Sequence, residues 1–130
     1  MWLALHAGRI GPVGVIYLRG ELDLATQPRL EGGLGDLLDT GCTRIVVSLD
    51  GIEFVDLSGL GLLARIHLML RSAGGWLRLA APPHGVRRLL ALTDLRDSLP
   101  VYPDVYAAIT DAERVHIAPP TARDHEDLPD

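Results

Sequence analysis

The 130-residue sequence predicts one α/β domain: a small, mostly parallel sheet of about four to five strands, with helices packed mainly on one face. From Val15 onward, short strand-like segments alternate with helix-like segments, which is the pattern of successive βαβ units. The links are short, and crossovers between parallel strands are right-handed. If each strand adds beside the previous one in one direction, all the helices are expected on the same face.

The first third of the chain predicts a strand pair followed by a glycine-rich helix. Residues 2–6 and 15–18 are the expected strands, and the glycines and the proline between them supply a turn. Leucines then recur at helical spacing over 30–38, after Thr26, which is a suitable N-cap. Gly41 is the expected end of this helix.

The rest of the chain repeats the alternation of strand and helix. The apolar run 45–49 predicts a buried strand, and a helix is expected from Ser58 to about Ser72. The other expected elements are a strand over 76–81, a helix over 86–92, a short strand over 101–102 and a helix over 104–112. Residues 1–114 are therefore the expected domain, and 115–130, with adjacent prolines and scattered charges, are an expected disordered tail.

Composition and charge narrow the classes of function. The net charge of −5, without a basic patch, argues against a nucleic-acid partner. Cys42 is the single cysteine, so no internal disulfide forms, and the five histidines lack metal-ligand spacing. The longest apolar stretch, 60–70, is too short for membrane insertion, and no signal-peptide pattern is present. We expect a cytoplasmic protein without a cofactor or metal.

The segment 50–63 is the most informative part of the sequence. It places Asp56, Ser58 and Gly59 at a strand-to-helix junction, with Ser58 opening the helix. Backbone N–H groups and the helix dipole stabilise negative charge there, so a hydroxyl at this point is well placed to carry a phosphate. Serine is also a preferred N-cap, so a purely structural role is the competing interpretation, and both roles can coexist.

Four motifs resemble those of STAS domains, in particular the bacterial anti-sigma factor antagonists, in the order and spacing of that family over roughly residues 10–112. The motifs are Gly20–Asp23 with the helix opened by Thr26, Asp56–Gly61, Gly74–Gly75 and Val86–Leu95. The resemblance implies a small sheet covered by helices and a protein that is not an enzyme.

The resemblance also implies a partner and a switch. Members bind an anti-sigma factor, usually an ATP-dependent serine kinase, and so release a sigma factor. The kinase phosphorylates a hydroxyl at the start of the second helix, which ends the interaction, and a metal-dependent serine phosphatase reverses this. Ser58 occupies the phosphoacceptor position, and Asp56 and Asp23 match acidic positions of the motifs. Many members carry two adjacent hydroxyl residues here, whereas this chain has Leu57 at the first position.

The residues around Ser58 are the expected partner-binding surface. They are Asp23, Asp56, Leu57, Ser58, Gly59, Leu60 and Gly61. The two glycines are expected to let a partner or a neighbouring backbone approach closely, since no Gly-x-x-x-x-Gly-Lys phosphate loop is present. The apolar residues of this helix extend further round it than one buried stripe needs, so Leu60 or Leu68 is a candidate for exposure.

Two alternatives from other classes remain open. One is a STAS scaffold module that is never phosphorylated and assembles into a multiprotein signalling or transport complex. The other is an enzyme with Ser58 as nucleophile, which is disfavoured because Ser58 lacks both a matched general base and a Gly-x-Ser-x-Gly context.

Overall fold

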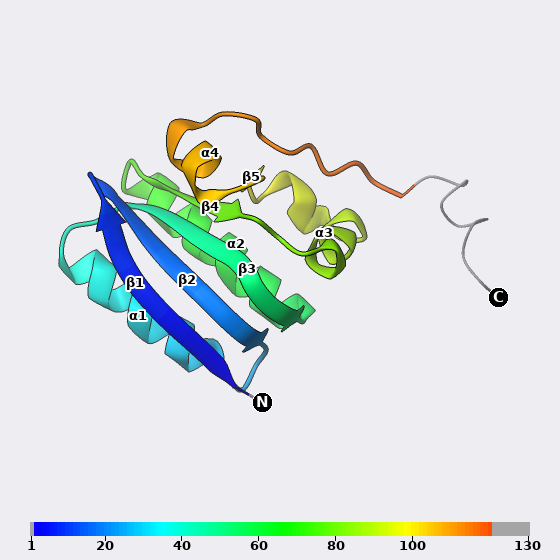
Figure 1. The fold of residues 1–130 in the computed structure, drawn as a ribbon, viewed down its shortest axis with the longest axis horizontal. Coiled ribbons are helices and arrows are strands. Elements are labelled where there is room, and N and C mark those ends of the chain that lie inside the picture. Colours follow the sequence, from blue (N-terminus) through cyan, green and yellow to red (C-terminus); the bar gives the residue numbers. More distant parts are fainter. Residues whose placement is uncertain (1, 121–130) are drawn as a thin grey trace.

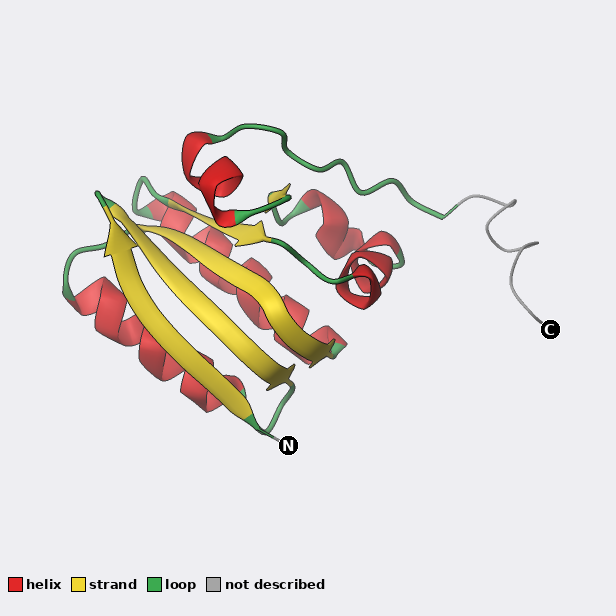
Figure 2. Ribbon diagram, in the orientation of Figure 1, coloured by secondary structure: helices red, strands yellow, loops and turns green. Residues whose placement is uncertain are grey.

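The computed structural model describes residues 2–120, which form a five-stranded mixed sheet with helices on both faces (Figures 1 and 2). The sheet order is β1-β2-β3-β4-β5; β1 pairs antiparallel with β2, and all other neighbours are parallel. The strands are β1 (Leu3–Ile10), β2 (Val13–Leu22), β3 (Arg44–Val55), β4 (Trp76–Ala80) and β5 (Val101–Tyr102). The helices are α1 (Gln27–Asp39), α2 (Leu57–Ser72), α3 (His84–Ala91), the 3₁₀ turn η1 (Asp94–Asp97) and α4 (Val105–Thr110). The predicted α/β class with a mostly parallel sheet is confirmed.

The first hairpin is longer than the sequence predicted. The turn is confined to Gly11 and Pro12, with Gly11 at a φ of +59° that favours glycine. Gly8 and Gly14 lie within the strands instead. Gly14 packs so closely against α1 and the segment after it that an added Cβ would lie 3.1 Å from Leu37 Cδ1 and 2.9 Å from Cys42 Sγ. Gly14 therefore serves close packing rather than the turn, whereas an added Cβ at Gly8 would meet no atom within 4 Å.

The expectation that all helices share one face is wrong for α4. The side chains of α1, α2 and α3 join one hydrophobic core with the strands. Ala107 and Ala108 of α4 belong to a second cluster with Val13, Val15 and Val46, and Figure 1 shows α4 on the opposite side of the sheet from α2. Because no strand of the sheet follows α4 within the chain described up to residue 120, this helix is not part of a crossover there, and the handedness rule does not fix its face.

The end of the described chain also packs on the domain. The Val115 N–H donates to the carbonyl of Val101 at 2.7 Å, and Ile117 packs against the main core. The predicted tail, 115–130, lies in part outside the described residues, from 121 onward.

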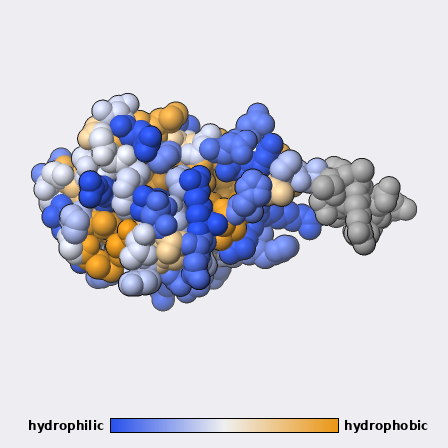
Figure 3. Space-filling view, turned by 90° about the horizontal axis from the view of Figure 1, so that it is seen from above, coloured by the Kyte–Doolittle hydropathy of each residue, from blue (hydrophilic) through white to orange (hydrophobic). Residues whose placement is uncertain are grey.

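Among residues 2–120, no helix combines the length and apolar character needed to cross a membrane. On the face seen in Figure 3, hydrophobic groups form small patches between hydrophilic ones.

Candidate functional site

Asp56 lies at the junction between β3 and α2 and caps the start of the helix. This residue has extended backbone angles (φ −93°, ψ 175°), and its Oδ1 accepts the Gly59 N–H at 2.8 Å, which makes it the N-cap of α2. The prediction that Ser58 opens the helix is therefore wrong: the helix begins one residue earlier, at Leu57, and its N-cap is Asp56. Aspartate and serine are similarly favoured at an N-cap, and here the aspartate takes the position. Ser58 is the second residue of the helix.

The Ser58 hydroxyl is held between two side chains. It donates a hydrogen bond of 2.7 Å to Asp56 Oδ1 and accepts one of 2.8 Å from Gln27 Nε2. Ser58 is half-buried, and these two hydrogen bonds give its hydroxyl a defined orientation. No other side chain in residues 2–120 hydrogen-bonds to it.

Asp56 is ionised at neutral pH. Partial burial opposes its charge, but the hydrogen bond from the Ser58 hydroxyl outweighs this, together with backbone N–H groups of Gly59, Leu24 and Ser58, and the pKa of the carboxyl falls below its ordinary value. A carboxylate therefore lies beside the Ser58 oxygen. It orients the hydroxyl, and it places a negative charge where a phosphate on Ser58 would be.

Asp23 shapes the neighbouring loop and makes no hydrogen bond to Ser58. Its Oδ1 accepts the Thr26 N–H at 3.0 Å, while its own N–H donates to Thr26 Oγ1 at 3.0 Å. Thr26 precedes α1 as predicted, but its side chain does not cap the helix, because the hydroxyl donates to the carbonyl of Glu21. Asp23 is buried, and its Oδ2 has no hydrogen-bond partner within the described chain. This loop fixes the start of α1 and thereby the position of Gln27.

Gln27 is the site residue that the sequence reasoning missed. It is the first residue of α1 and is buried, yet its amide reaches Ser58 at the start of α2. The carboxyl ends of β2 and β3 lie side by side in the parallel sheet, so the helices that follow them begin close together. A polar residue at the first position of the preceding helix was the signal available in the sequence.

The remaining predicted residues divide between core and surface. Leu60 is fully buried, so its side chain belongs to the core and is removed from the predicted partner surface. Leu57 is 57% exposed and Leu68 is 64% exposed. Gly59 lies against β2, where an added Cβ would be 2.9 Å from both Cγ and the carbonyl oxygen of Leu22. The prediction of close backbone approach is thus confirmed for Gly59.

This arrangement suits the Ser58 oxygen to accept a transferred group such as a phosphate. The Ser58 hydroxyl donates to a carboxylate and sits in the first turn of a helix, where partial positive charge favours a bound anion. Residues 2–120 contain no group of three or more histidine, cysteine or acidic side chains placed to hold a metal ion.

Comparison with known proteins agrees with the geometry. The STAS domain family model matches residues 4–108. An anti-sigma F factor antagonist from Paenibacillus polymyxa is 29% identical over 102 residues, covering 78% of this chain and 87% of the relative. An anti-sigma-B factor antagonist from Staphylococcus aureus is 32% identical over 86 residues, covering 66% and 80%. The crystal structure of an anti-sigma factor antagonist from Mycobacterium paratuberculosis superposes with a TM-score of 0.76 at 28% identity, covering 85% of this chain and 94% of that one.

Proposed function

The chain belongs to the STAS domain family, and we propose that it is an anti-sigma factor antagonist. In this proposal it binds an anti-sigma factor that is also a serine kinase, and so frees a sigma factor for transcription. Phosphorylation of Ser58 ends the binding, and a serine phosphatase restores it. The names of its relatives support the general role. The partner and the switch rest on the site itself.

The observation that carries the proposal is the orientation of the Ser58 hydroxyl. Asp56 and Gln27 hold it at the first turn of α2, on a residue that is half-buried. Two exposed leucines are near: Leu57 precedes Ser58, and Leu24 is 73% exposed with its backbone beside the Asp56 carboxylate. Exposed apolar side chains around a polar group are a common composition for a protein-binding surface.

A phosphate at Ser58 changes this surface far more than it changes the fold. It adds about −1.5 to −2 charges at neutral pH, beside the ionised Asp56. The helix N-terminus offsets about 0.3–1 kcal/mol of the repulsion between the phosphate and Asp56. Burying an unpaired charge against a partner costs several kcal/mol, and each ~1.4 kcal/mol weakens binding about tenfold. The expected result is release of the partner without unfolding.

Phosphorylation in vitro tests the modification directly. The protein is incubated with ATP and each candidate anti-sigma kinase of its host, and modified residues are mapped by mass spectrometry. We expect phosphate on Ser58 of the wild type, none on Ser58→Ala, and normal labelling of a Ser72→Ala control, which changes an exposed serine at the far end of the same helix. Absence of phosphate on Ser58 with every cognate kinase contradicts the switch.

Affinity purification from the host tests the consequence for binding. Wild type, Ser58→Asp and Ser72→Asp serve as baits, and retained proteins are identified by mass spectrometry. We expect the wild type and Ser72→Asp to retain a kinase-like anti-sigma factor and Ser58→Asp to lose it. Retention of the same partners by all three supports instead a constitutive STAS scaffold, an alternative favoured by Leu57 at a position where many members carry a hydroxyl.

A further inference from the structure

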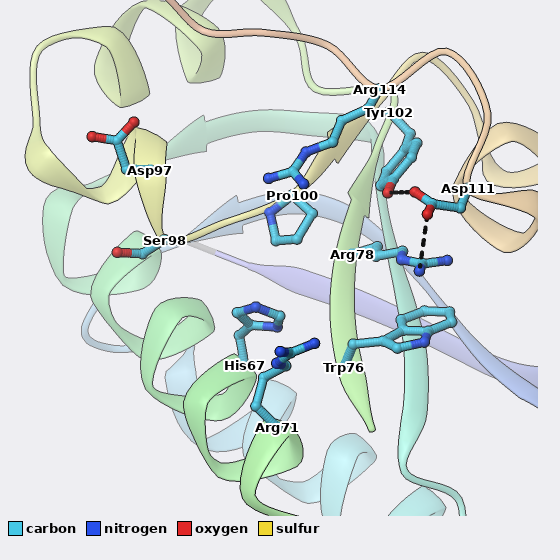
Figure 4. A pocket seen from close by; sticks show the side chains of 10 residues that line it. All are labelled: His67, Arg71, Trp76, Arg78, Asp97, Ser98, Pro100, Tyr102, Asp111 and Arg114. Atoms are coloured by element: carbon cyan, nitrogen blue, oxygen red, sulfur yellow. Dashed lines mark hydrogen bonds and ion pairs between the residues drawn. The ribbon is translucent and has the colours of Figure 1, made fainter. Parts of the chain in front are cut away.

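A polar pocket lies in the other half of α2 from the Ser58 junction. Its cavity volume is about 370 Å³, within the range of small-molecule sites. Its walls come from the C-terminal half of α2, the start of β4, the turn before β5 and the segment after α4 (Figure 4). The lining residues used below are His67, Arg71, Trp76, Arg78, Asp111 and Arg114. Ser58 is nine or more residues away along α2, or roughly 14 Å at 1.5 Å per residue.

The pocket is lined by more positive than negative side chains. Three arginines line it, against two acidic residues, Asp97 and Asp111. Asp111 is already engaged, since it accepts the Tyr102 hydroxyl and lies 3.9 Å from Arg78 Nη2. Within residues 2–120, neither Arg71 nor Arg114 has a carboxylate within ion-pair distance, and both are exposed. An anion entering the pocket would meet two guanidinium groups without an internal partner.

Arg78 is held rigidly as the third cation. Its guanidinium carbon lies 3.7 Å from the centre of the Trp76 ring, and its Nη1 donates to the carbonyl of Ala108 at 2.8 Å. A guanidinium has five N–H donors, and these contacts leave some of them available. Because stacking and hydrogen bonding have already fixed the side chain, little conformational entropy is lost when it binds a ligand.

His67 adds a neutral donor. Its Nδ1 accepts the Leu77 N–H at 3.0 Å, at a point on the edge of β4 that the two-residue β5 does not reach. With Nδ1 as acceptor, the proton of the neutral ring is on Nε2, which makes that atom a donor. Burial, and then the positive charges of Arg71, Arg114 and Arg78, lower the pKa of His67, so the neutral form persists at neutral pH. In Figure 4, His67 and Arg71 of α2 lie on one side of β4 and the stacked Trp76 and Arg78 side chains on the other, and all four residues line the pocket at this edge of the sheet.

We propose that this pocket binds a small multivalent anion, a compound bearing phosphate or carboxylate groups, through Arg71, Arg78 and Arg114 with His67 as an additional donor. Guanidinium groups bind both oxyanions in bidentate fashion, so the two ligand classes share one chemistry. The proposal is independent of the switch at Ser58. It gives the domain a separate site at which a small molecule binds.

Titration followed by ¹H–¹⁵N correlation NMR tests the proposal. The full chain is titrated with sodium pyrophosphate in one series and sodium citrate in another, at constant ionic strength maintained with chloride. We expect saturable shifts of the Trp76 indole N–H and of the Arg71, Leu77 and Arg114 amides, with the amides near Ser58 unchanged. Saturation with pyrophosphate alone assigns a phosphate ligand, and saturation with citrate alone a carboxylate ligand.

Matched arginine variants decide whether the effect is local. Arg71→Gln and Arg114→Gln each remove a charge-assisted contact and are expected to weaken binding about tenfold or more. Arg65→Gln removes the same charge from an exposed position of α2 outside the pocket and should bind as the wild type does. Dispersed spectra confirm that each variant is folded. The proposal is overturned if both anions give only linear shifts, or if Arg65→Gln weakens binding as much as the other two.

Discussion

Ser58 and Asp56 are joined through a single atom: the Asp56 Oδ1 that accepts the Ser58 hydroxyl also accepts the Gly59 N–H. The N-cap of α2 and the orientation of the candidate phosphoacceptor therefore depend on the same carboxylate oxygen. A kinase that modifies Ser58 would break one of these hydrogen bonds and leave the other. The local helix start is expected to survive modification.

Substitution of Asp56 separates its capping role from its charge. Asp56→Ala removes the cap and should lower the free energy of unfolding by about 1 kcal/mol, whereas Asp56→Asn keeps a capping oxygen and should cost only a fraction of that. Urea denaturation followed by circular dichroism measures both. An Asp56→Asn variant as unstable as Asp56→Ala would mean that the charge, and not the cap, stabilises the junction.

The hydrogen bond between Gln27 and Ser58 should appear as an energetic coupling. We expect a double-mutant cycle of Gln27→Ala and Ser58→Ala to give an interaction energy of about 0.5–1.5 kcal/mol. Urea titrations give the free energies of unfolding of the wild type, the two single variants and the double variant. Gln27→Ala combined with Ser72→Ala is the control and should be additive within about 0.5 kcal/mol. Additivity in both cycles would show that the Gln27 contact contributes no stability.

The two glycines of the Asp56–Gly61 motif should respond oppositely to alanine. At Gly59 the new Cβ would lie 2.9 Å from the Leu22 carbonyl oxygen, so Gly59→Ala forces α2 away from β2 and should destabilise by about 1–3 kcal/mol. At Gly61 the nearest atom is the mobile Arg65 Nη1 at 3.5 Å, so Gly61→Ala should stabilise by roughly 0.5–1 kcal/mol through helix propensity. Thermal unfolding of the pair checks this, and equal effects of the two substitutions would contradict it.

The sequence predicted those features that depend on local pattern. The alternation of strand and helix, the short strand Val101–Tyr102 and the junction around Asp56 are all found in the structure. The lengths of the first three strands were underestimated, because pairing continues where the apolar pattern stops. β3 runs on past its apolar run to Val55, since Gly51 and Phe54 still pair with β2 across register shifts.

Features that depend on contacts between distant residues could not be predicted. Gln27 meets Ser58 only because two parallel strands end side by side. Periodicity left Leu60 and Leu68 as equal candidates for exposure, and only packing against the sheet buries the first and leaves the second at the surface. The cationic pocket gathers residues from four separate segments, each of which resembles an ordinary solvated surface in the sequence.

The hydrogen bond from the Leu77 N–H to His67 predicts loss of stability on acidification. Burial, followed by the charges of Arg71, Arg114 and Arg78, lowers the pKa of His67 in the folded state below its ordinary value of 6.5. Protonation would place a proton on Nδ1, which then could no longer accept the Leu77 N–H. A lowered folded-state pKa means that the unfolded chain binds the proton more tightly. This contribution to stability is therefore complete above pH 6.5 and is lost as the pH falls through the folded-state pKa.

Urea denaturation between about pH 7.5 and 5 measures this dependence. The wild type should lose stability across the range, and His67→Asn, which offers a non-titrating acceptor oxygen near the position of Nδ1, should lose less. His116→Asn changes an exposed histidine and should follow the wild type. If His67→Asn is as pH-dependent as the wild type, the loss comes from other groups, and the bond to Leu77 does not link the edge of β4 to protonation.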